Sequence, residues 1–116
     1  MAVGYNPKII TDGLVLCLDA GNTKSYPGSG TSWSDLSGQG NTGTLTNGPT
    51  YNSTNGGSLV FDGTNDYVST GLVLPSPSTT PTTFDLVFKY NSSSTFRGLI
   101  GSSAYRSTGF SVGFMG

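Results

Sequence analysis

The chain has 116 residues, of which only 9% are charged, all six acidic residues are Asp, and neither Glu nor His occurs. A net charge of −1 is unsuited to neutralising nucleic-acid phosphates, so we expect no nucleic-acid partner. Without His the chain cannot assemble a Ser-His-Asp or Cys-His nucleophile, and we expect no enzymatic activity.

Gly, Ser, Thr and Asn supply about half of the positions, which leaves little material for long helices. We expect residues 1–12 to form an extended N-terminal arm and residues 13–116 to form one domain. The N-terminus lacks the basic and apolar regions of a signal peptide, and the longest apolar run, residues 14–18, is too short to cross a bilayer. We therefore expect no membrane insertion.

The first predicted strand is residues 13–19, an apolar run bounded by Gly residues that suits a strand buried on both faces. Residues 23–51 are rich in Gly, Ser and Asn, and are expected to form a long loop across a sheet. Trp33 and Leu36 are its expected anchors. The single Cys17 lies inside the first apolar run, where we expect it to act as a small buried hydrophobe.

Further strands are predicted at residues 58–61 and 67–68, and the Asp-Gly turn between them indicates a hairpin. Residues 84–90 alternate between large apolar and other side chains, which predicts a strand with one face inward. Short strands are also expected at residues 99–101 and 109–114. This succession of short strands and Gly- or Pro-rich turns is typical of an all-β antiparallel sandwich or jelly roll.

Four segments resemble the laminin-G-like, concanavalin A-like jelly-roll family: residues 13–20 (GLVLCLDA), 33–45 (WSDLSGQGNTGTL), 58–68 (SLVFDGTNDYV) and the alternating residues 84–90. The resemblance implies a two-sheet antiparallel sandwich. Family domains continue with further strands beyond the position of residue 116, so we expect the sandwich to be incomplete at its C-terminal end. Two alternatives follow for the edge that this leaves: the chain continues beyond residue 116, or a neighbouring chain pairs with the edge. The second alternative predicts a homo-oligomer, by analogy with fibres and decorations a trimer.

Residues 4–13 (GYNPKIITDG) and 25–30 (SYPGSG) are similar to virion proteins of tailed phages that carry this domain, including cyanophages. The resemblance implies a virion protein without enzymatic activity, in a tail fibre, another tail-associated position or a capsid decoration. Its partners would be other virion proteins and host-surface polysaccharide. Two alternatives stay open: a purely structural cement protein without glycan affinity, and a glycan-active enzyme, which the absence of Glu disfavours.

Two groups of residues are candidates for a site. Asp62, Asn65 and Asp66 offer oxygen ligands that calcium would take, although they lack the spacing of an EF-hand loop. The alternative is that Asp62 accepts backbone N–H groups of its own turn and Asp66 begins the next strand. Tyr26 and Trp33 could stack on a sugar ring, or anchor the long loop on the core. We favour the structural role for both groups, and we expect no other cofactor.

Overall fold

The computed structural model describes residues 9–73, 81–90, 97–101 and 111–114, and these residues form short antiparallel strands with almost no helix. The all-β, antiparallel class predicted from the sequence is confirmed. The chain divides into two compact units, Met1–Ser76 and Pro77–Gly116, which are described separately below. The described residues contain no helix that is long and apolar enough to cross a membrane.

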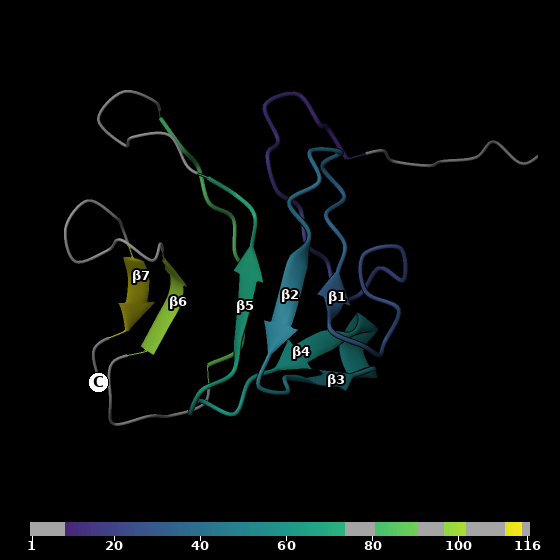
Figure 1. The fold of residues 1–116 in the computed structure, drawn as a ribbon, viewed down its shortest axis with the longest axis vertical. Helices are drawn as coiled ribbons and strands as arrows, with labels where there is room; N and C mark the ends of the chain where they lie inside the picture. Colours follow the sequence, from purple (N-terminus) through teal and green to yellow (C-terminus); the bar gives the residue numbers. More distant parts are fainter. Residues whose placement is uncertain (1–8, 74–80, 91–96, 102–110, 115–116) are drawn as a thin grey trace, which may run out of the picture. The chain divides into compact units, whose positions relative to one another are not determined.

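The first unit contains a three-stranded sheet in the order β1–β2–β5 (Figure 1). Its strands are β1 (Ser32–Trp33), β2 (Gly43–Thr46) and β5 (Tyr67–Thr70). Both pairs are antiparallel, with Trp33 opposite Gly43 and Leu45 opposite Val68. Side chains alternate between the two faces of a strand, so Trp33, Gly43, Leu45 and Val68 share the inward face.

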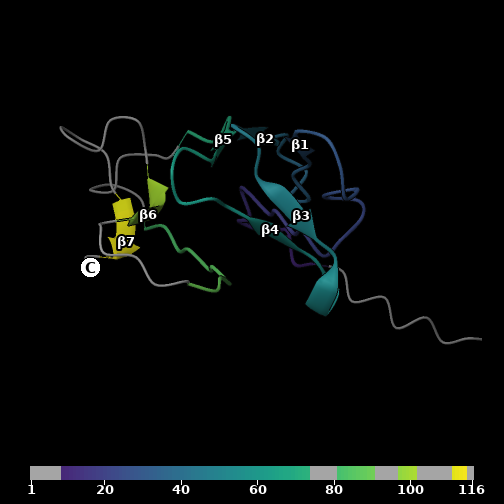
Figure 2. The same ribbon diagram turned by 90° about the horizontal axis from the view of Figure 1, so that it is seen from below.

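A hairpin of β3 (Thr50–Asn52) and β4 (Ser58–Val60) forms a second layer in this unit (Figure 2). The 3₁₀ turn Thr54–Gly56 connects its strands. The side chain of Asn52 accepts the Thr54 backbone N–H at 2.9 Å and thereby closes the turn. Before the hairpin, the chain leaves β2 through Asn47 and Gly48, both at positive φ.

The core of this unit is small. Tyr26 and Leu45 are the buried hydrophobic side chains among the described residues, at 3% and 5% exposure. The Tyr26 ring contacts Tyr51 of β3, with the ring centroids 5.5 Å apart. The core therefore includes this contact between the chain ahead of β1 and the hairpin, and large side chains supply most of its apolar surface.

The N-terminal segment differs from its prediction. Residues 13–19 form no strand, and Val15 is 45% exposed, so the predicted strand buried on both faces is wrong. Instead of a strand ladder, the segment has single hydrogen bonds to the loop that follows β1. Cys17 accepts the backbone N–H of Leu36 at 2.8 Å, and Val15 accepts the side-chain amide of Asn41 at 2.8 Å.

The prediction of one long loop over residues 23–51 is also wrong, because β1, β2 and the start of β3 lie within it. Strands at residues 58–60 and 67–70 confirm two predicted positions, but the predicted hairpin between them does not form. β4 pairs with β3 and β5 pairs with β2. Residues 61–66 instead carry the chain from one layer to the other. The turn in this segment is closed by the carboxylates of Asp62 and Asp66.

The second unit contains β6 (Arg97–Gly101) and β7 (Ser111–Phe114), which pair antiparallel with an irregularity between Gly98 and Ile100. They confirm the strands predicted at residues 99–101 and 109–114, except that residues 109 and 110 lie outside the described part. Residues 84–90 form no strand, and all but Phe84 are exposed, so the strand predicted there is wrong. An alternating pattern of side chains does not by itself specify a strand, because a strand also depends on the segment with which it pairs.

Candidate functional site

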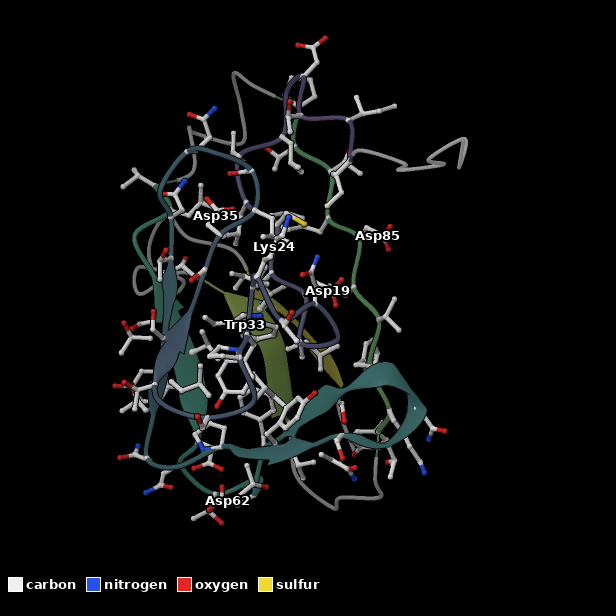
Figure 3. The ribbon with its side chains drawn as sticks, turned by 90° about the vertical axis from the view of Figure 1, so that its right-hand side faces the viewer. Asp19, Lys24, Trp33, Asp35, Asp62 and Asp85 are labelled. Atoms are coloured by element: carbon white, nitrogen blue, oxygen red, sulfur yellow. The ribbon has the colours of Figure 1, made fainter. Side chains whose placement is uncertain are left out.

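The carboxylate of Asp35 lies at the centre of a hydrogen-bonded turn after β1 (Figure 3). Its Oδ1 accepts the backbone N–H groups of Cys17 and Ser37, each at 2.9 Å. Its Oδ2 accepts the Ser37 hydroxyl at 2.7 Å and the Asn41 backbone N–H at 2.9 Å. One carboxylate thus shapes residues 35–41 and attaches them to the N-terminal segment.

These hydrogen bonds keep Asp35 ionised. Burial acts to raise the pKa of Asp35, but the hydrogen bonds from the Ser37 side chain, the Ser37 backbone, Cys17 and Asn41 outweigh it and lower the pKa below the usual value. A carboxyl with a lowered pKa is a poor general acid near neutral pH. With four donors already bound, Asp35 has a structural role in the turn.

Asp62 closes a second turn, which lies at the other end of the first unit from Asp35 (Figure 3). Its Oδ1 accepts the backbone N–H groups of Thr64, Asn65 and Asp66 at 2.7, 3.2 and 3.4 Å. In return, Oδ2 of Asp66 accepts the backbone N–H of Asp62 at 3.0 Å. Asp62 therefore closes its own turn, as the structural interpretation of this cluster expects, and the contact from Asp66 adds a second brace that the sequence did not predict.

The calcium interpretation of Asp62, Asn65 and Asp66 stays a prediction. The structure brings the three residues into one turn, where the Asn65 carbonyl accepts the side-chain amide of Asn47 at 2.7 Å. Oδ1 of Asp66 is buried without a hydrogen-bond partner. Within the described ranges, however, no group of three or more metal-ligating Cys or Asp side chains is placed to hold an ion.

The two aromatic candidates lie on the inner side of the first unit. Tyr26 is 3% exposed and its hydroxyl donates to the Gly30 carbonyl at 2.9 Å, so its ring has no free face for a sugar. Trp33 is half-buried on the inward face of β1, and its indole Nε1 is buried without a hydrogen-bond partner. Figure 3 shows Trp33 between the sheet and the β3–β4 hairpin, a position that suits the anchoring role.

Cys17 is a half-buried thiol beside two carboxylates. Burial raises the pKa of Cys17, and the negative charges of Asp19 and Asp35 raise it further. Because the thiolate is the nucleophilic form, a raised pKa lowers the reactivity of the thiol at neutral pH.

Sequence reasoning missed one feature, which is the outward face of the β1–β2–β5 sheet. The residues on this face all carry a hydroxyl group: Ser32, Thr44, Thr46, Tyr67 and Ser69. We call this set the hydroxyl face. The alternation of Thr with other residues over 43–46 could have indicated two of its five members, Thr44 and Thr46. The full set depends on which strands pair.

Comparison of the chain with protein-family models, with curated proteins and with solved structures found no match. The resemblance to laminin-G-like domains therefore stays a prediction from the sequence segments that carry it.

Proposed function

We propose that the chain is a non-enzymatic module of a tailed-phage virion, in a tail fibre, another tail-associated position or a capsid decoration, with an antiparallel jelly-roll sandwich as its framework. The virion assignment depends on the resemblance described above. The all-β antiparallel class supports the framework, because a rigid sheet can present loops and a flat face to a large partner. The proposed activity is adhesion to host-surface glycans.

One observation carries the adhesive part of this proposal: in the first unit the chain uses its turn carboxylates internally and presents uncharged hydroxyl groups outward. Asp35 and Asp62 each bind several backbone N–H groups. The hydroxyl face carries no charged side chain. Such a surface can hydrogen-bond to polar polymers but lacks a free carboxylate pair for hydrolysis.

A second candidate function is structural cement that contacts only other virion subunits. The observation that favours it is the number of large apolar side chains at the surface. In the first unit Val60 and Phe61 are each 44% exposed, and Val73 is 86% exposed. Contiguous exposed apolar groups are typical of surfaces that contact another protein, and Val60 and Phe61 are neighbours in the chain.

A glycan array probed with the labelled chain, followed by a pull-down on intact host cells, separates the two functions. The adhesive function expects retention on a defined set of saccharides, and repeated copies in a particle would strengthen weak single contacts by avidity. Retention on none of them, together with incorporation into particles, would refute adhesion and favour the cement function.

A further inference from the structure

The hydroxyl face is ordered by the pairing of its three strands. Ser32 of β1 lies opposite Thr44 of β2, and Thr44 lies opposite Ser69 of β5, so these three form one row across the sheet. Thr46 and Tyr67 form the next row. Strand geometry spaces neighbours within a row by about 4.8 Å and the rows by roughly 6.8 Å. The result is a regular patch of hydroxyl groups.

These hydroxyl groups are available to a ligand. Four of the five residues are exposed, and Thr46 is half-buried. In the described part of the chain, none of the five side-chain hydroxyls has a hydrogen-bond partner. By contrast, the buried hydroxyl of Ser25 donates to the Ser34 carbonyl at 2.7 Å, and that of Ser37 donates to Asp35. The buried hydroxyls of Ser25 and Ser37 are thus used within the fold, whereas those of the hydroxyl face are open to an external ligand.

The chemistry of the face selects one class of ligand. Each hydroxyl is both a donor and an acceptor, as are the hydroxyl groups of a sugar ring. The Tyr67 side chain is 51% exposed and offers an aromatic surface against which the apolar side of a sugar can pack.

Charge favours a neutral polymer over an acidic one. No member of the face is charged, and Asp62 and Asp66 lie in the turn that leads directly into β5. Their negative charges would repel a carboxylated or sulfated chain at the Tyr67 end of the face.

We propose that the hydroxyl face is the site at which this chain binds a neutral polysaccharide. This inference rests on the proposed adhesive function and adds to it the location of the site and the class of glycan. Contacts are distributed over a flat sheet rather than concentrated in a pocket, so single-copy binding is weak and improves with the number of copies.

The test is affinity electrophoresis of the full 116-residue chain in gels that contain hydroxyethylcellulose, dextran or galactomannan as neutral polymers, or alginate as an acidic one. The face variant combines Thr44→Val, Tyr67→Ala and Ser69→Ala. The control combines Thr50→Val with Ser58→Ala, which removes exposed hydroxyls from the β3–β4 hairpin instead. Circular dichroism establishes that each variant keeps the strand signal of the parent, and Thr→Val suits a strand.

We expect at least one neutral polymer to retard the parent and the control equally. The face variant should bind that polymer about tenfold more weakly, because it loses the net contribution of about two hydrogen bonds. Equal binding by the face variant would overturn this inference and leave the adhesive function intact. Stronger binding to alginate would refute the neutral class. Binding to no saccharide would refute adhesion itself. If sedimentation velocity shows that the parent self-associates and the face variant does not, the face binds a second copy of the chain instead.

Discussion

The Asp35 carboxylate accepts the backbone N–H of Cys17, which lies 18 residues earlier in the chain, at 2.9 Å. The same oxygen also accepts the N–H of Ser37 at 2.9 Å. One side chain therefore connects the N-terminal segment to the turn after β1, where the sequence predicted a strand. The carboxylate replaces part of the hydrogen bonding that regular pairing would provide.

Replacement of Asp35 by Asn tests this connection. The amide keeps one acceptor oxygen, but its NH₂ group faces donors that the carboxylate satisfied. We expect Asp35→Asn to lower the free energy of unfolding by about 1–3 kcal/mol. Urea denaturation measures the change, and Asp12→Asn, at an exposed residue of the N-terminal segment, is the control. An equal loss of stability in both variants would contradict the special role of Asp35.

The lowered pKa of Asp35 predicts a pH dependence of stability. A carboxyl whose pKa is lower in the folded state stabilises the fold fully above its unfolded pKa, and that contribution is lost as the pH falls through the folded pKa. We expect the parent to lose stability below about pH 4, near the ordinary Asp value. Asp35→Asn should show a flatter profile there in urea titrations at successive pH values. Parallel profiles would show that other groups account for the acid sensitivity.

Gly57 is predicted to be intolerant of a side chain. An added Cβ would lie 2.7 Å from the Tyr51 hydroxyl oxygen and 2.8 Å from the Ala20 carbonyl oxygen, at a φ of 103°. Gly48 has a similar φ of 100° but open space around it. Gly48→Ala should therefore cost about 1–2 kcal/mol for the backbone conformation alone. Gly57→Ala should cost about 1–3 kcal/mol more because of the close contacts. Thermal melts of both variants measure the difference, and equal losses would contradict the predicted contacts.

Calcium should leave the stability of the chain unchanged if the turn at residues 62–66 is closed by its own carboxylates. A ligand that binds only the folded state raises the melting temperature. We expect no rise on addition of about 1 mM calcium, a concentration that fills weak extracellular sites. Asp62→Ala should lower the melting temperature with or without calcium. A calcium-dependent rise that Asp62→Ala abolishes would instead establish the cation site.

The thiol of Cys17 should alkylate slowly in the folded chain. Its raised pKa means that a smaller fraction is thiolate at a given pH than in the unfolded chain. The rate of reaction with iodoacetamide should rise at a higher pH for the native chain than for the chain in urea. A native rate profile at lower pH than the unfolded one would refute the raised pKa.

The sequence was informative where structure depends on local pattern. Strands at residues 58–60 and 67–70 were predicted from short apolar runs between turns, and the Asp62 turn was predicted from its residue types. Pairing was not predictable in the same way. The Asp-Gly signal suggested a hairpin, yet each strand has a partner from the segment predicted as a loop. Strands as short as Ser32–Trp33 carry too few residues for a periodic pattern.

In the candidate sites, too, contacts between residues close in the sequence were predictable and contacts between distant residues were not. The reciprocal contacts of Asp62 and Asp66 span four residues and could be anticipated. The contact of Asp35 with Cys17 spans 18 residues and could not. Likewise the hydroxyl face combines residues from 32 to 69, which only the strand register brings together.

The crossover through residues 61–66 also bears on how the chain reaches its native state. Thr46 and Tyr67 are paired neighbours, yet the whole β3–β4 hairpin lies between them in the sequence. Bringing distant segments together costs entropy that grows with the length of free chain between them. A hairpin that forms first shortens that free length, and the hydrogen bond from Asn47 to Asn65 then joins the two ends of the enclosed segment. The nested order of strands therefore favours folding in which the β3–β4 hairpin forms before β2 pairs with β5. Variants that weaken the 3₁₀ turn at Thr54–Gly56 should then slow folding more than they speed unfolding.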